Sequence, residues 1–178
     1  MADKKFIIIV AIITLVIMLG GIALVNSSSS TPQILSSENA RLQLSSQSDG
    51  GQAKAETVEP TSYDWGNISY SGTKATKTFA IRNTGSDPLK LFNVKTSCHC
   101  TKAHVTIDGK DSPDFGMSGI SSWAGEVPVG KEAKVTVIFD QAFHGPQGIG
   151  PITRFVSIET NDRGTPKITF TLTGTVVK

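Results

Sequence analysis

The chain has 178 residues, which is room for one ordinary domain with further segments at its ends. Its formal net charge of +2 is small and its basic residues are spread along the chain, which argues against a nucleic-acid-binding protein with a concentrated basic face. The two cysteines, Cys98 and Cys100, are too few for a disulfide scaffold and stand one residue apart, so their chemistry is local.

The first predicted element is a transmembrane helix over residues 6–25. This run carries no charged residue, and at about 1.5 Å per residue it spans roughly 30 Å, the thickness of a bilayer's hydrocarbon core. Lys4 and Lys5 precede it, so the N-terminus is expected in the cytoplasm and the rest outside, as a single-pass membrane protein of the cell envelope. The alternative is a signal peptide cleaved after the run, for example after Ser27, although the apolar region of such peptides usually has only about 7 to 15 residues.

Residues 26–61 are predicted to form a flexible linker. Serine and glycine dominate this stretch and large apolar residues are rare, so it cannot bury enough surface to offset the entropy lost on ordering. A flexible chain of about 36 residues has a root-mean-square reach of roughly 30–35 Å. The predicted organisation is therefore an anchor in residues 1–25, a linker in residues 26–61 and one domain in residues 62–178.

From residue 62 onward the apolar residues alternate with polar ones, which is typical of β-strands. Turn-forming glycine, proline, asparagine and aspartate separate the runs. About seven strands without an amphipathic helix predict an all-β fold, an immunoglobulin-like antiparallel β-sandwich. The predicted strands are 63–68, 76–83, 89–96, 104–107, 133–140, 154–160 and 167–177. The residues predicted to face the core are Phe79, Ile81, Leu89, Leu91, Val94, Val135, Val137, Phe139, Ile168, Phe170 and Leu172.

Three segments follow one another in a characteristic order: Tyr-Asp-Trp-Gly-Asn-Ile at 63–68, Thr-Phe-Ala-Ile-Arg-Asn-Thr-Gly at 78–85, and the run through Ser-Cys-His-Cys-Thr at 88–101. With the strand at 129–140, this order resembles the bacterial domain-of-unknown-function family fifteen-seventy-three. The resemblance implies an Ig-like sandwich related to domains of the Hydin and ASPM type, and it implies no activity. The chain departs from the family in having His99 where glycine is usual, and in the long loop 108–127.

The Cys-His-Cys motif has three interpretations: packing or a local disulfide, soft-metal binding, and a redox role. In an extended chain Cys98 and Cys100 point to one face, and a disulfide between them would need a tight turn. Two thiolates roughly 4 Å apart can instead hold one soft ion, Cu(I) or Zn(II). The predicted metal ligands are Cys98, Cys100, His99 and His104, and Met117 and His144 are further side chains that loops could supply. His144 itself stands in a glycine- and proline-rich turn and is interpreted as an exposed loop histidine.

No nucleophile elbow or phosphate-binding glycine loop occurs in the sequence, and we expect no enzymatic activity. The leading hypothesis is a non-enzymatic protein-binding or scaffolding module on the outer side of a membrane. It would contact a protein partner through a sheet edge or through the loop that carries Phe115, Met117 and Trp123. The alternative is soft-metal or thiol-redox handling by the Cys-His-Cys motif; no cofactor beyond Cu(I) or Zn(II) is implied.

Overall fold

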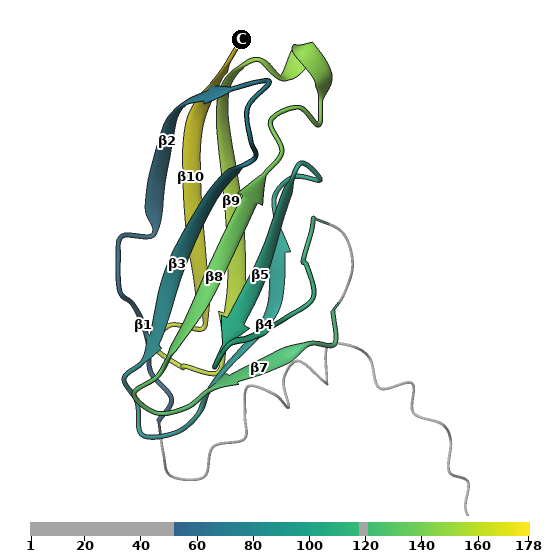
Figure 1. Ribbon diagram of the computed structural model, residues 1–178. Helices are drawn as coiled ribbons and strands as arrows, with labels where there is room; N and C mark the ends of the chain where they lie inside the picture. The colour runs from purple at the N-terminus through teal and green to yellow at the C-terminus, as the bar shows by residue number, and fades with distance from the viewer. Residues whose placement is uncertain (1–51, 118–120) are drawn as a thin grey trace, which may run out of the picture. The chain divides into compact units, whose positions relative to one another are not determined.

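The computed structural model describes residues 52–117 and 121–178 (Figure 1). The predicted transmembrane segment and most of the predicted linker lie outside the described residues. Within them, no helix has both the length and the apolar character of a membrane span.

The described residues form two five-stranded sheets that pack face to face as a sandwich (Figure 1). The first sheet has the order β1 (Ala55–Thr57), β3 (Ala75–Asn83), β8 (Glu132–Phe139), β5 (Thr101–Ile107) and β6 (Lys110–Asp111). The second has the order β2 (Ser62–Ser69), β10 (Lys167–Val177), β9 (Gly150–Thr160), β4 (Leu89–Thr96) and β7 (Ala124–Val127). One short 3₁₀ helix, η1 (Gly145–Gly148), precedes β9 in the described part of the chain.

The seven predicted strands are all present, so the predicted all-β sandwich is confirmed. Three further strands, β1, β6 and β7, have only two to four residues, which is too short for a period of two to be recognised. Strand β1 lies within the segment predicted as linker and pairs with the end of β3. In the part of this segment that the structure describes, residues 52–61, the buried residues are the small Ala53 and Ala55, which give no apolar alternation that a sequence reading could use.

The pairings within each sheet are antiparallel except one, because β2 runs parallel to β10. Strand β2 lies at the edge of the second sheet, whereas the next strand, β3, belongs to the first. The chain therefore crosses between the sheets directly after β2. The alternation of side chains predicts that β2 is a strand, but it does not predict which neighbour it pairs with or in which direction.

The core lies between the two sheets and is built by alternate residues of the long strands. Phe79 of β3 and Phe170 of β10 stack across it with their ring centroids 4.2 Å apart, and both side chains are fully buried. The residues predicted to face the core are all buried, which confirms the assignment of strand faces.

A second, smaller apolar cluster fills one end of the sandwich. Its buried members are Ile68, Cys100, Phe139, Ile152 and Val176. Trp65 of β2 stacks on Phe139, with ring centroids 5.8 Å apart, and covers the cluster from the edge of the second sheet. The turn from β4 to β5, the end of β8 and the start of β9 meet at this end (Figure 1), so it gathers residues far apart in the sequence.

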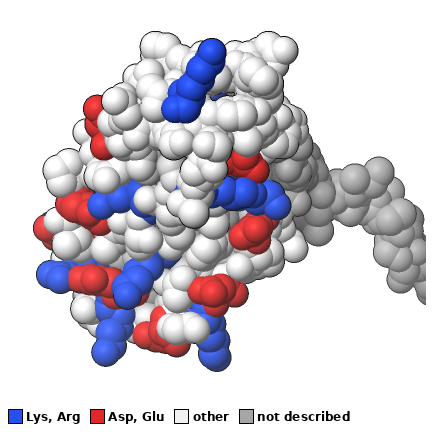
Figure 2. All heavy atoms as spheres, turned by 45° about the horizontal axis from the view of Figure 1, so that its top comes forward, with Lys and Arg blue, Asp and Glu red and all other residues white. Residues whose placement is uncertain are grey.

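Charged side chains of both signs lie next to one another on the face that Figure 2 shows, in which the top of Figure 1 is turned forward. The ion pairs of the described residues include Lys77 Nζ with Glu59 Oε2 at 2.7 Å and Lys74 Nζ with Asp140 Oδ2 at 2.8 Å. Much of the upper part of this face is uncharged. The charges seen on this face therefore form no basic patch.

Candidate functional site

The Cys-His-Cys motif lies in the turn between β4 and β5. Thr96 Oγ1 is hydrogen-bonded to the carbonyl oxygens of Cys98 (3.1 Å) and Thr101 (3.0 Å), and the Thr101 N–H donates to the Cys98 carbonyl (3.1 Å). These bonds between a side chain and the backbone curl the chain directly after β4. The chain is not extended at these positions: the turn brings the two cysteine Cα atoms to 5.2 Å, the kind of tight turn that a local disulfide requires.

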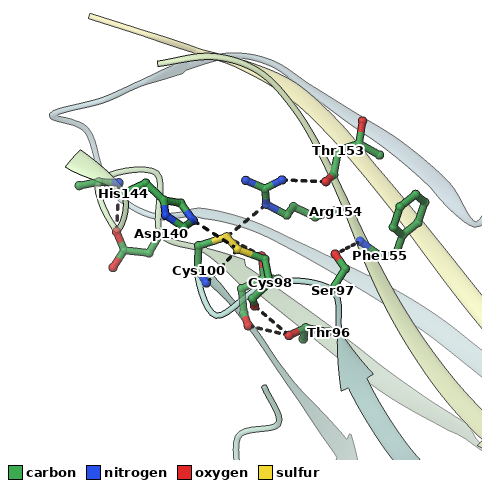
Figure 3. Close-up of a disulfide and its surroundings, with 11 residues drawn as sticks. Thr96, Ser97, Cys98, Cys100, Asp140, His144, Thr153, Arg154 and Phe155 are labelled. Carbon is green, nitrogen blue, oxygen red and sulfur yellow. Dashed lines mark hydrogen bonds between the residues drawn. A yellow bond between two sulfur atoms is a disulfide. The ribbon is translucent and has the colours of Figure 1, made fainter. Parts of the chain in front are cut away.

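Cys98 and Cys100 form a disulfide (Figure 3). Its loop has three residues, for which the chain-entropy model gives a stabilisation of about 1.6 kcal/mol, compared with about 4.7 kcal/mol for a loop of 100 residues. Two hydrogen bonds between Ser97 and Phe155 also hold the turn. Ser97 N–H donates to the Phe155 carbonyl and Phe155 N–H donates to Ser97 Oγ, both at 2.9 Å. The disulfide is therefore a local feature on a turn that other bonds also fix.

The two cysteines differ in their surroundings. Cys100 is 2% exposed and packs in the apolar end cluster, and its carbonyl accepts a 2.8 Å hydrogen bond from Asp140 N–H just after β8. Cys98 is half-buried against the same cluster. A reagent from solvent thus meets the Cys98 sulfur before the Cys100 sulfur.

A basic side chain approaches each sulfur atom from a different element. Arg154 of β9 directs Nε at Cys100 Sγ over 3.2 Å, and its guanidinium carbon lies 5.1 Å from the centre of the Phe139 ring. The exposed His144, in the loop after β8, places Nε2 at 3.5 Å from Cys98 Sγ. In Figure 3 the two side chains reach the disulfide from opposite sides.

The charged guanidinium of Arg154 lies in partly apolar surroundings. Burial lowers the pKa of Arg154 below its ordinary value. Its Nη1 donates to the Thr153 carbonyl at 2.8 Å, and in the described residues no carboxylate forms an ion pair with it. The guanidinium is therefore half-buried beside a neutral sulfur, which is a weak hydrogen-bond acceptor.

Among the described residues, one group of three side chains is suited to a metal ion: Cys98, Cys100 and His144, whose ligand atoms all lie within 4.8 Å of one another. Two thiolates and one imidazole are ligands that soft ions favour, once the disulfide is reduced. The predicted ligands His99 and His104 are not part of this group. His99 is exposed, and His104 on β5 lies 3.6 Å from the Asp114 carboxylate. Metal binding by the motif stays a prediction.

The predicted partner loop is tied to the first sheet at its start. Phe115 is 5% exposed and its backbone exchanges two hydrogen bonds with Ala103 of β5, at 3.0 and 2.7 Å. Trp123 is partly buried and its ring lies 5.3 Å from that of Phe115, whereas Met117 is 43% exposed. Of the three predicted contact residues, Met117 is the one that offers a largely exposed side chain.

Strand β2 is a long edge strand: in the described structure it pairs with β10 alone, and six of its eight residues are exposed. The middle of β2 is irregular, because Gly66 has a φ of 65° and the Gly66 N–H donates to Oδ1 of Asp64, two residues earlier, at 3.0 Å. Such an irregularity blunts an edge against pairing with another chain. The regular backbone before it, at Ser62 and Tyr63, remains accessible.

Comparisons with known proteins agree with this architecture. Residues 57–110 match the model of the family described as "Protein of unknown function (DUF1573)", which confirms the resemblance inferred from the segment order. The comparison with curated proteins found no match.

Among solved structures, the chain is similar to a protein of unknown function from Porphyromonas gingivalis W83, with a TM-score of 0.54 and 19% identity over 74% of this chain and 50% of that chain. The likeness shows the fold, and the chain spans half the length of that protein. Weaker similarities are to a PapD-like domain of human CEP192 (TM-score 0.45, 16% identity, 75% and 92% covered) and to an MSP family member from C. elegans (0.35, 14%, 71% and 98%).

Proposed function

We propose that this chain is a membrane-anchored, extracytoplasmic β-sandwich that acts as a non-enzymatic protein-binding module. The observation that carries the binding proposal is the open edge of β2, which within the described part of the chain has a paired strand on one side only. An extended segment of a partner can add to such an edge through backbone hydrogen bonds, with specificity from the side chains beside it.

The aromatic side chain of Tyr63 lies beside this edge. The Tyr63 side chain is 40% exposed and meets the Trp65 ring edge to face at 6.3 Å. Lys77 Nζ lies 4.9 Å from the centre of the Tyr63 ring and is itself fixed by the ion pair with Glu59. A tyrosine held in this way loses little conformational entropy on binding, which favours it as an anchor for a partner.

The membrane part of the proposal is supported by the uncharged run at residues 6–25 and by the two lysines before it. The test is fractionation of cells producing the full chain, followed by protease treatment from the outer side of the membrane. We expect the chain in the membrane fraction after alkaline extraction, and the domain degraded by external protease. A chain that is released by alkali, or a domain that stays protected, would contradict the proposal.

Two hollows of the described surface bear on the absence of catalysis in the proposal. One is lined by residues of the β5–β6 corner with Trp123 and Glu126, and another by residues of β2 and the turn that follows it. Neither contains a cysteine or a histidine. The thiol and imidazole groups that could serve as nucleophile and base are therefore outside both hollows.

Partner binding is tested by placing a photo-cross-linking residue at Tyr63 of the full chain in its own membrane. Val129, 51% exposed in the turn before β8, provides the matched control position, and Met117 tests the loop. We expect discrete protein adducts from position 63 and none from position 129. Adducts from position 117 alone would move the binding surface to the loop, and equal labelling at all three positions would contradict a specific binding surface.

A second candidate function, soft-metal or thiol-redox handling, is favoured by the grouping of Cys98, Cys100 and His144. The metal version is tested by titrating the reduced full chain in detergent with Cu(I) against a competing chelator, and separately with Zn(II). We expect the affinity to fall in a Cys98→Ser/Cys100→Ser variant and less severely in His144→Ala. An unchanged affinity in the double variant would show that the motif is not the metal site.

A further inference from the structure

We infer that the Cys98–Cys100 disulfide is a polarised thiol-exchange site, in which a donor thiolate attacks Cys98 and Cys100 leaves as a thiolate paired with Arg154. The inference deepens the second candidate function and rests on its thiol-redox version. It assigns a different role to each sulfur atom and a positioning role to Arg154.

The positive charge of Arg154 is poorly compensated while the disulfide is intact. Its guanidinium is half-buried and is directed by Nε at Cys100 Sγ, 3.2 Å away, with no carboxylate paired to it in the described residues. A disulfide sulfur accepts a hydrogen bond weakly, so this arrangement is poorly compensated while the disulfide is intact. A thiolate at the same place would complete a charge-assisted hydrogen bond.

The two sulfur atoms also differ in their access from solvent. Cys100 is 2% exposed within the apolar end cluster, whereas Cys98 is half-buried and lies beside the exposed His144. Exchange requires the incoming thiolate to reach the sulfur that it attacks, and it is faster when the other sulfur is a stabilised leaving group. Access therefore selects Cys98 for attack, and Arg154 selects Cys100 as the leaving group.

The reaction balances with a dithiol as the donor. The first donor thiolate forms a bond to Cys98 Sγ, the Cys98–Cys100 bond breaks, and its electron pair stays on Cys100 Sγ. The second donor thiolate then attacks the donor sulfur of this mixed disulfide and releases Cys98 as a thiolate. One dithiol and one disulfide become one disulfide and one dithiol, two electrons pass from the donor to the domain, and the protons of the donor thiols pass to solvent or to the new thiolates.

The hydrogen bonds of the turn do not depend on whether the two cysteines are oxidised or reduced. The hydrogen bonds of Thr96 and the pair between Ser97 and Phe155 hold the chain on either side of the motif without the sulfur–sulfur bond. A three-residue disulfide loop also adds little constraint to the unfolded chain. Opening and closing of the bond can therefore proceed with the sandwich folded.

The experiment treats the oxidised full chain in detergent with glutathione at fixed pH. The reaction is quenched with acid, and the position of the mixed disulfide is mapped by mass spectrometry. We expect the glutathione adduct on Cys98 in at least tenfold excess over Cys100. In Arg154→Met we expect the rate of attack to fall about tenfold, and in Arg154→Lys to recover in part. Arg163→Met, which removes an exposed arginine in the turn between β9 and β10, is the matched control and should react as the original chain does.

The outcomes separate the inference from the function on which it rests. A disulfide that glutathione does not open in any of these chains would refute the thiol-redox candidate itself. A disulfide that opens with adducts on Cys100, or equally on both sulfurs, would refute the polarity while leaving exchange in place. A rate that does not change in Arg154→Met would refute the role of Arg154, and tryptophan fluorescence checks that this variant is folded. If Arg154→Met is not folded, the role of Arg154 is judged from the position of the adduct in the original chain and from the reaction rate of Arg154→Lys.

Discussion

Buried polar side chains determine several of the turns of this domain, and Asn83 at the end of β3 is a fully buried example. Its Nδ2 donates to the carbonyls of Asp87 (2.8 Å) and Val127 (2.9 Å), and its Oδ1 accepts from Gly85 N–H at 3.0 Å. One side chain thus joins the turn after β3 to the end of β7. Because the groups are buried, each would lack a partner if the amide were removed.

Replacing this amide tests its role. Asn83→Ala leaves two carbonyls and one N–H without their partner, and we expect the free energy of unfolding to fall by about 2–3 kcal/mol. Urea unfolding of the full chain in detergent measures it through tryptophan fluorescence, because Trp65 and Trp123 both lie in the domain. Thr78→Ala removes a hydroxyl that pairs with Thr136 at an exposed position and should change stability by less than about 0.5 kcal/mol. An equal loss in both variants would contradict the importance of burial.

The ion pair between Lys74 and Asp140 should make the stability of the domain depend on pH. The hydrogen bond from Lys74, 2.8 Å from Asp140 Oδ2, is the main reason that the pKa of Asp140 lies below its ordinary value. A lowered folded-state pKa gives stabilisation that is complete above the unfolded-state value of about 4 and is lost as the pH falls through the folded-state value. Lys74→Gln should therefore lower stability at pH 7, by less than about 1 kcal/mol because the pair is partly exposed, and have a smaller effect near pH 2. Unfolding curves at the two pH values measure the difference; an equal effect at both would contradict the role of the Asp140 charge.

At the scale of elements, the turn after β3 holds the segment that leads into the short strand β1. Thr84 and Ser86 donate backbone hydrogen bonds to the carbonyls of Lys54 and Gln52, both at 2.9 Å. Gly85 lies between them, so close to the N-terminal segment that an added Cβ would stand 2.1 Å from the Gln52 carbonyl oxygen. The turn after β3 therefore holds residues 52–54 against the sheet, and only a glycine fits there.

Gly85→Ala tests this close approach. The methyl group must displace the backbone of residues 52–54, and we expect a loss of about 1–3 kcal/mol together with faster hydrogen exchange at the Thr84 and Ser86 amides. Gly116→Ala is the control, because a Cβ at Gly116 meets no atom within 4 Å and its backbone is unstrained. Unchanged amide exchange in Gly85→Ala would show that the segment can shift without cost.

The strand pattern predicted seven strands because each is long enough to show alternation, and the inward residues followed from the same alternation. For the candidate site the sequence predicted Cys98 and Cys100, whose types and spacing carry chemistry by themselves. It did not single out Arg154, which looks like an ordinary exposed residue of a strand, and it gave His144 little weight. The only sequence signal for His144 is a histidine in a turn, which is common at exposed positions.

At the scale of the whole molecule, the two sheets are held together by a core that both contribute to. Phe79 and Phe170 come from different sheets and stack at its centre. Phe170→Ala removes a fully buried ring and should cost about 3–5 kcal/mol, a large part of the roughly 5–15 kcal/mol that stabilises a typical domain.

The matched control for this core prediction is Phe155→Ala on β9, because that ring is 45% exposed. We expect a loss below about 1 kcal/mol, measured by thermal unfolding of the full chain in detergent. If the two truncations cost the same, burial between the sheets would not be the main source of stability.

The sequence by itself determined the all-β class, the faces of the strands and the identity of the thiol pair, because these depend on residue types and on a period of two along one strand. Only the tertiary structure decided the parallel pairing of β2 with β10, the addition of β1 to β3 and the meeting of His144 and Arg154 at the two sulfur atoms. Those contacts join residues 24 to 109 positions apart, and their geometry depends on how the sheets pack rather than on any local pattern. The Cys-His-Cys turn shows the same limit at short range: the residue types left a local disulfide and an ion site both open, and the hydrogen bonds of Thr96 that curl the segment appear only in the structure.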